Sequence, residues 1–318
     1  MHFDGVLFVA FGGPTPGCCK AFEPCPGSEA VCFVRAIVGD RPGAQARIAE
    51  VAAHYRPLGG FSPFNPLTFQ QVEGVAARLV ARGIRVPVRV GMRYWPPYVR
   101  DVLKEMLAQG CRSLLAVILS AFQSPASWDH YQYTVTQALA ALRARAMRVA
   151  YLDTWHAQLG YVEALADRIR QASQELGPGR AREALLIYTA HALPEPMAAT
   201  CPYVQQYGET AAAVAQRLGR STYRLAYQSQ VPGTPVPWLQ PDVNAVIRQA
   251  KAEGYRDVIV APIGFLCEHV EVLYDLDIEA RQTAVACGIG YVRAKTVGDH
   301  PAFLSMLSER IAARLTEE

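Results

Sequence analysis

The sequence predicts an α/β protein built from two doubly wound halves, each a four-stranded parallel sheet flanked by helices. Three observations predict this class. Eight short apolar runs recur along the 318 residues, segments with helical periodicity fill most of the gaps, and several runs end in Gly, His or Gln rather than in ordinary turns. Such alternation is typical of parallel sheets covered by helices on both faces. The eight strands could also close as one barrel, but the Gly/Pro-rich segment after the first strand and the polar segment 175–182 favour two halves.

The expected elements follow in chain order. Strands are predicted at residues 6–10, 86–91, 113–119, 148–152, 184–189, 223–227, 257–263 and 290–295. Helices are predicted between them, among others at 98–109, 161–175, 210–218 and 243–253, the last stopping at Gly254. We expect one domain over residues 1–157 and a second over 158–318. The final helix, 301–315, either ends the second half or packs back on the first.

Composition limits the partners of this chain. A hydrophobic content of 51% is enough for a sizeable core. The net charge of +3 and the lack of long basic runs argue against a nucleic-acid partner. No apolar run reaches 18 residues, and no signal-peptide pattern precedes the first strand. We therefore expect a cytoplasmic monomer without a transmembrane segment, acting on small molecules.

Eight cysteines are present and no two of them form a CxxC pair. The notable group, in a Gly/Pro-rich loop, comprises Cys18, Cys19, Cys25 and Cys32. Four cysteines can hold an iron–sulfur cluster, but this spacing matches none of the usual ligand runs. We expect reduced thiols rather than a cluster.

The stretch 261–280 changes character from a buried strand to a helical pattern after Gly264. Within the helical part, Glu271, Asp275 and Glu279 fall at i, i+4 and i+8, which stacks three carboxylates along one face. Like charges at this spacing destabilise a helix by a few tenths of a kcal/mol per pair. The row is either a solvated acidic face or a site for a cation. Its position beside the carboxyl end of a strand, where ligands bind in open parallel sheets, favours the cation site.

Distinctive residues also follow the other predicted strands. His191 follows an apolar strand, and its unperturbed pKa near 6.5 suits it to accept a proton or to bind a metal. A structural histidine is an equally good interpretation from spacing alone. For His269, beside the start of the acidic helix, a structural role is favoured. If the two halves face each other, these strand ends line one cleft.

Two further segments have the composition of ligand-contacting loops. The turn at Gly12 and Gly13 allows close approach of backbone to a ligand, but it lacks the GxGxxG spacing of a dinucleotide site. The loop 55–64 is aromatic, basic and rich in Gly and Pro. It either covers a flat apolar ligand, with Arg56 meeting a carboxylate, or is a packed surface loop.

Three motifs in order resemble the ferrochelatase family: TAHALP at 189–194, YQSQ at 227–230 with PWLQP at 237–241, and GFLCEHVEVLYDLD at 264–277. Weaker matches in the first half are GGP at 12–14, YRPLGGFSP at 55–63 and GMRYWPP at 91–97. The resemblance covers nearly the whole chain. It implies a chelatase fold of two Rossmann-like halves around a porphyrin cleft.

The resemblance also implies an activity and its residues. It implies a lyase-type metal chelatase that inserts Fe²⁺, as substrate metal, into coproporphyrin III or protoporphyrin IX in haem biosynthesis, without an organic cofactor. His191 would accept pyrrole protons or contact the metal, Glu271 would be its carboxylate partner, and Asp275 and Glu279 would be further metal or proton ligands. The residues that would bind the porphyrin are Phe11, Gly12, Gly13, Tyr55, Arg56, Ser62, Pro63 and Trp238.

Some residues depart from the family pattern. Phe11 stands where some bacterial members carry a tyrosine, Phe122 lies where some carry a histidine, and Glu268 replaces an aspartate. The short segment before the Gly-Gly loop favours the coproporphyrin-using branch. Two alternatives remain: a cobalt or nickel chelatase acting on another tetrapyrrole, and a non-catalytic porphyrin-binding protein. The acidic row argues against the latter, because a carrier has no need of it.

Overall fold

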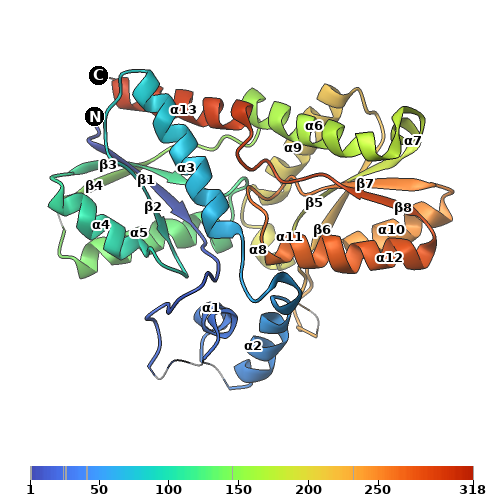
Figure 1. Cartoon of the computed structure of the whole chain (residues 1–318), viewed down its shortest axis with the longest axis horizontal. Coiled ribbons are helices and arrows are strands. Elements are labelled where there is room, and N and C mark those ends of the chain that lie inside the picture. Colours follow the sequence, from blue (N-terminus) through green and yellow to red (C-terminus); the bar gives the residue numbers. More distant parts are fainter. Residues whose placement is uncertain are drawn as a thin grey trace. The chain divides into compact units, whose positions relative to one another are not determined.

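The structure is a computed structural model that describes residues 2–23, 25, 27–40, 42–144, 146–231 and 233–317. The chain forms two compact units (Figure 1). The first takes in the residues up to Leu119, Asp129–Asp153 and the chain from Leu307 onward; the second comprises Ser120–Trp128 and Thr154–Met306. Each unit contains one four-stranded parallel sheet, so the predicted fold class is confirmed.

The sheet of the first unit has the strand order β2-β1-β3-β4. Its strands are β1 (Gly5–Ala10), β2 (Val88–Met92), β3 (Ser113–Ile118) and β4 (Arg148–Tyr151). Every residue of β1 and β3 is buried, as expected for central strands covered on both faces. Val6 pairs with Val88 on one side and with Leu115 on the other.

Helical segments of the first unit lie between its strands in the sequence. They are α1 (Glu29–Val38), α2 (Ala44–Ala53), the 3₁₀ turn η1 (Arg56–Leu58), α3 (Phe64–Ala81), α4 (Val99–Ala108) and α5 (His130–Ala141). α3 and α4 pack on β2, α4 also contacts α5, and α1 packs against α2. In α4 the buried residues recur at helical spacing, at Val99, Val102, Leu103 and Met106, which explains why this segment folds as an amphipathic helix.

The sheet of the second unit has the order β6-β5-β7-β8. Its strands are β5 (Leu185–His191), β6 (Tyr223–Gln228), β7 (Asp257–Ala261) and β8 (Gly290–Arg293). The core beneath it is made of aliphatic side chains such as Ile187, Val258 and Val260, all fully buried. The predicted strand 257–263 ends at Ala261, because Pro262 and a tight turn closed by the Ile263 N–H on the Ala261 carbonyl interrupt it.

Two pairs of helices flank the second sheet, α6 with α9 and α10 with α12 (Figure 1). The helical elements of this unit are η2 (Pro125–Asp129, a π-turn), α6 (Leu159–Ser173), η3 (Gln174–Leu176, 3₁₀), α7 (Pro178–Glu183), α8 (Glu195–Ala198), α9 (Tyr203–Leu218), α10 (Val243–Ala252), α11 (Val270–Tyr274), η4 (Asp275–Ala280, a π-helix) and α12 (Arg281–Cys287). The last helix, α13 (Pro301–Thr316), begins in the second unit and continues into the first from Leu307. Among the described residues, no helix is long and apolar enough to cross a membrane.

The boundary between the two units is not a single point between residues 157 and 158, because each unit is made of more than one stretch of the chain. The chain leaves the first unit at Asp153, and the segment Ser120–Trp128 already belongs to the second. Side-chain packing explains why the segment Ser120–Trp128 belongs to the second unit: the ring of Phe122 is buried against Tyr203 and Tyr207 of α9, with ring centroids 5.7 Å apart in both pairs.

Candidate active site

Two of the predicted residues, His191 and Glu271, come together in the second unit. His191 is the last residue of β5 and Glu271 lies in α11, and the His191 Nε2 atom is 3.6 Å from Glu271 Oε1. The His191 Nδ1–H donates to the Ala192 carbonyl, which leaves Nε2 facing the carboxylate. The Tyr203 hydroxyl donates to the His191 carbonyl at 2.8 Å and so fixes the strand end.

The environment of His191 changes its acidity. Burial lowers the pKa of this imidazole, but the charge and hydrogen bond of Glu271, aided by the Ala192 carbonyl and Asp275, raise the pKa to about 9. A third of the side chain, 33%, remains exposed, so water moderates the effect of burial. The pair therefore combines an imidazole with a carboxylate that stabilises its protonated form.

His269 has a different role. It caps α11: its Nδ1 accepts the backbone N–H of Glu271 at 3.2 Å. Its ring packs edge-on against Phe265, and burial lowers the pKa of His269 despite the nearby Glu271 and Glu268. The structural role expected for His269 agrees with these contacts.

The acidic row departs from the continuous α-helix that its spacing predicts. α11 ends at Tyr274, and Asp275 and Glu279 lie in the π-helix η4, whose turns are wider than α-helical turns. Ser229 Oγ donates to the carboxylate of Asp275. Burial, together with the charges of Glu271 and Glu279, raises the pKa of Asp275 to about 7, although the Ser229 bond opposes this shift.

Glu279 is exposed, and its pKa is raised by partial burial of its carboxyl group and by Asp242. Within the described part of the chain, no three His, Cys, Asp or Glu side chains converge closely enough to hold one metal ion together. Of the three residues in the acidic row, Glu271 pairs with His191, and Asp275 and Glu279 follow it along the chain.

Gln228 and Ser229, the last residue of β6 and the residue after it, contact the acidic segment but were not predicted as site residues. Gln228 Nε2 donates to the Glu271 carbonyl at 2.6 Å, and no described residue donates to its buried Oε1. Ser229 has a φ of 61°, a left-handed conformation that costs a non-glycine residue about 1–2 kcal/mol. Two polar residues at the carboxyl end of a predicted strand are the sequence signal for this contact.

In the first unit, the turn after β1 packs tightly against protein. Gly12 has a φ of 94°, and a Cβ there would lie 3.1 Å from the Trp95 backbone nitrogen. A Cβ on Gly13 would lie 2.8 Å from that of Ser62, and the Ser62 N–H donates to the Pro14 carbonyl. The structure therefore brings the glycine turn together with the start of the Ser62-Pro63 segment, and both glycines are required by this packing.

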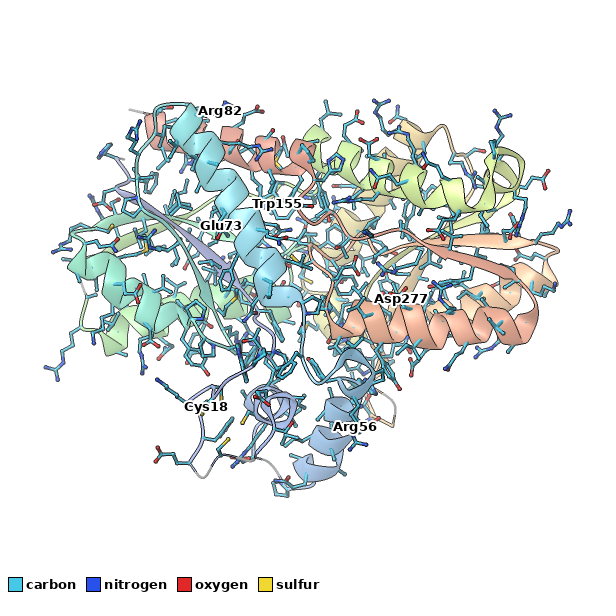
Figure 2. The ribbon with its side chains drawn as sticks, in the orientation of Figure 1. Cys18, Arg56, Glu73, Arg82, Trp155 and Asp277 are labelled. Atoms are coloured by element: carbon cyan, nitrogen blue, oxygen red, sulfur yellow. The ribbon has the colours of Figure 1, made fainter. Side chains whose placement is uncertain are left out.

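The aromatic residues near this turn form one cluster. The Phe11 ring lies 4.8 Å from that of Tyr94 and 6.0 Å from that of Phe33, between ring centroids, and Phe33 also contacts the buried Tyr55 and Trp95. Apolar rings of this kind are typical of the walls of a site for a flat ligand. Arg56, in η1, is exposed (Figure 2).

Trp238 belongs to the second unit. It forms an isolated antiparallel bridge with Pro194, three residues after His191, and its Nε1–H donates to Thr234 Oγ1 at 2.8 Å. The Leu239 N–H donates to the Leu193 carbonyl at 2.9 Å. These bonds hold the Trp238 segment against the loop that follows His191.

The cysteine group lies in the first unit, between β1 and the end of α1. Cys19 and Cys32 are buried, Cys18 is exposed (Figure 2), and Cys25 Sγ is 3.9 Å from Cys32 Sγ. Burial and the neighbouring thiols Cys19 and Cys25 raise the pKa of Cys32 to about 12, which favours the protonated thiol.

Comparison with known proteins decides the family. The ferrochelatase family profile matches residues 28–315. The chain belongs to the ferrochelatase family. Ferrochelatase from Rhodopirellula baltica is 34% identical over 98% of this chain and 86% of its own length, and ferrochelatase from Deinococcus radiodurans is 33% identical over 98% and 96%. Coproporphyrin III ferrochelatase from Mycolicibacterium smegmatis is 33% identical over 98% and 89%.

Solved structures agree with this fold. The chelatase SirB from Bacillus subtilis with Fe³⁺ superposes with a TM-score of 0.59 at 12% identity, covering 98% of this chain and 95% of SirB. At that identity the likeness concerns the fold alone. Membership of the ferrochelatase family confirms the predicted activity: a lyase-type metal chelatase that inserts Fe²⁺ into a porphyrin in haem biosynthesis.

Proposed function

We propose that this ferrochelatase uses His191 as the acceptor of pyrrole protons, with Glu271 as the carboxylate that meets the incoming metal. The observation that carries the proposal is the 3.6 Å approach of His191 Nε2 to Glu271 Oε1. Insertion of Fe²⁺ releases two pyrrole protons, so the reaction needs a base beside an anionic oxygen ligand. Because Nδ1 is engaged with the Ala192 carbonyl, Nε2 is the atom of His191 that exchanges protons. In the metal-free protein the pKa of about 9 keeps Nε2 protonated at neutral pH, so Nε2 releases this proton before it accepts one from a pyrrole.

Asp275 and Glu279 extend the site along η4 in this proposal. The hydroxyl of Ser229 holds Asp275, and Glu279 is exposed to solvent. A row of carboxylates that runs from water to the His191–Glu271 pair gives a hydrated dication, or a departing proton, successive oxygen partners.

Coproporphyrin III is the porphyrin that we infer for this chain. The inference has two supports: the short segment before the Gly-Gly loop, and the likeness to a relative named coproporphyrin III ferrochelatase at 33% identity. The porphyrin-binding residues of the proposal are Phe11, Gly12, Gly13, Tyr55, Arg56, Ser62, Pro63 and Trp238.

The test is anaerobic insertion of Fe²⁺, followed by absorbance, with coproporphyrin III and protoporphyrin IX in parallel. His191→Ala is expected to lower the insertion rate about 10²–10⁴-fold, the usual contribution of a positioned base, while porphyrin still binds. The matched control is His156→Ala, because His156 also pairs with a glutamate in this unit, with its Nε2 2.8 Å from Glu209 Oε2.

The outcomes separate the alternatives. Near-normal insertion by His191→Ala would remove the proton-acceptor role. Faster insertion into protoporphyrin IX would overturn the choice of porphyrin. A wild-type protein that binds porphyrin without metallating it would favour the carrier, or, if Co²⁺ is inserted instead, the cobalt chelatase.

A further inference from the structure

Arg293 is a buried guanidinium that holds two carboxylates at once. It is the last residue of β8, and only 10% of its side chain is exposed. Nε and Nη2 donate to the two oxygens of Asp277 at 2.8 and 2.6 Å, and Nη1 lies 2.9 Å from both oxygens of Glu268. Such fork-shaped contacts are among the strongest charge-assisted hydrogen bonds in proteins, and lysine cannot reproduce them.

The two carboxylates lie on either side of Glu271 and Asp275, two residues of the proposed site. Glu268 immediately precedes the capping residue His269, and its Oε1 also accepts the Thr296 N–H at 2.8 Å. Asp277 lies in η4, two residues beyond Asp275. Between Glu268 and Asp277 lie α11 and the first two residues of η4.

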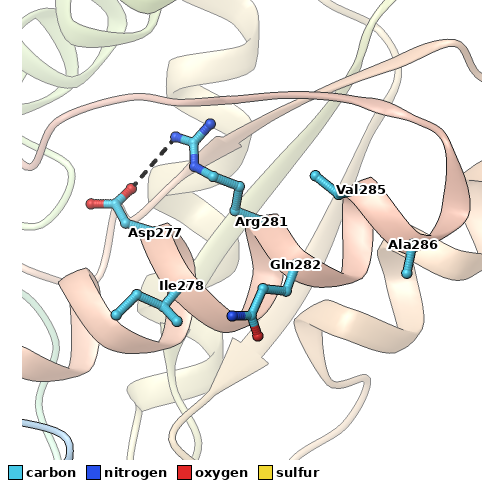
Figure 3. Close-up of a pocket in the computed structure, with 6 residues that line it drawn as sticks. All are labelled: Asp277, Ile278, Arg281, Gln282, Val285 and Ala286. Carbon is cyan, nitrogen blue, oxygen red and sulfur yellow. Dashed lines mark ion pairs between the residues drawn. The ribbon is translucent and has the colours of Figure 1, made fainter. Parts of the chain in front are cut away.

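This segment contains an irregular turn: α11, η4 and α12 follow one another without a break, and the six residues of η4 form a π-helical stretch between the two α-helical parts. π-helical turns are rare and occur mostly as single-turn irregularities inside α-helices, frequently at functional sites, so contacts from outside the helix help to hold this one. On the outer surface of η4 and α12, Asp277 also faces Arg281, with Nη2 4.0 Å from Oδ1 (Figure 3). The charge of Asp277 is therefore engaged by arginines, whereas Glu271 and Asp275 face His191 and Ser229.

We propose that Arg293 is a positioning residue for metal insertion: by holding Glu268 and Asp277 together, it fixes the segment 268–277 so that the Glu271 carboxylate stays against His191 Nε2. The inference rests on the proposed roles of His191 and Glu271. It also divides the acidic residues of this region by task. Glu268 and Asp277 are structural partners of Arg293, and Glu271, Asp275 and Glu279 remain for the metal and the protons.

The test compares Arg293→Lys with Arg180→Lys. Arg180, in α7, forks onto the buried Asp257 at the amino end of β7, so it is an arginine–carboxylate pair in the same unit that does not hold the segment 268–277. For Arg293→Lys we expect kcat/KM for Fe²⁺ to fall at least about tenfold, since misplacement of about 1 Å can cost about a hundredfold, with porphyrin affinity unchanged. Arg180→Lys is expected to keep kcat/KM within about twofold.

Each outcome of this comparison supports or overturns the positioning role of Arg293. Wild-type kinetics in Arg293→Lys, or an equal loss in Arg180→Lys, would overturn the positioning role, because the effect would then be absent or merely structural. If the melting temperature of Arg293→Lys falls while kcat/KM for Fe²⁺ is retained, Arg293 acts only on stability. Failure of the proposed function is recognised separately, by wild-type protein that inserts no iron or by His191→Ala that inserts it normally.

Discussion

Glu271→Gln is expected to lower the pKa of His191 by about 1–2 units, because it removes a charge at nearly constant shape. A full charge 3.6 Å from His191 Nε2 contributes about 1 kcal/mol at the dielectric constant of water and about 5 kcal/mol at an effective dielectric constant of about 20. The Glu271 side chain is 42% exposed and that of His191 33% exposed, so solvent screening limits the interaction free energy of the pair to about 1.5–3 kcal/mol. One pKa unit corresponds to about 1.4 kcal/mol.

The assay is NMR titration of the His191 Cε1–H resonance in the porphyrin-free protein, assigned with His191→Ala. Wild-type His191 is expected to titrate near pH 9 and the Glu271→Gln variant near pH 7–8. The direction follows from the sign of the charge: a carboxylate stabilises the imidazolium, so removing it favours the neutral ring. A pKa that is unchanged within a few tenths of a unit would refute the pairing of these two residues in solution.

Three further predictions concern stability. Tyr161→Phe removes the buried hydrogen bond to the Ile263 carbonyl and is expected to cost about 1–3 kcal/mol in denaturant unfolding; no loss would mean that water replaces the hydroxyl. Gly264→Ala is expected to lower the melting temperature, because its Cβ would lie 2.7 Å from that of Ala190; a wild-type melting temperature would show that the backbone gives way. Burial lowers the pKa of His300, so wild-type unfolding free energy should fall as pH drops below about 6.5, the unfolded pKa. His300→Asn should remove this loss of unfolding free energy at low pH. A variant with the same pH profile as the wild type would contradict the prediction.

Much of the fold follows from local patterns. Fully buried runs such as β1 and β3 need nothing but their apolar sequence to be predicted as central strands, and their alternation with helices predicts two parallel sheets. His191 could be selected from sequence because it ends an apolar strand, at the edge of the sheet where parallel strands end together, and Glu271 because it belongs to an acidic row beyond the next buried strand. The roles expected of both come from the family resemblance.

The spacing of the acidic residues does not predict how their segment folds; only the tertiary structure determines it. The α-helical row of Glu271, Asp275 and Glu279 is interrupted by a π-helix, since the local helix is anchored from outside the segment. Its anchors are Arg293, sixteen residues after Asp277, and Ser229, forty-six residues before Asp275. Contacts over such separations depend on strand order and on side-chain packing. The sequence alone therefore predicted the acidic residues as candidates, and only the folded chain decided that Glu268 and Asp277 pair with Arg293.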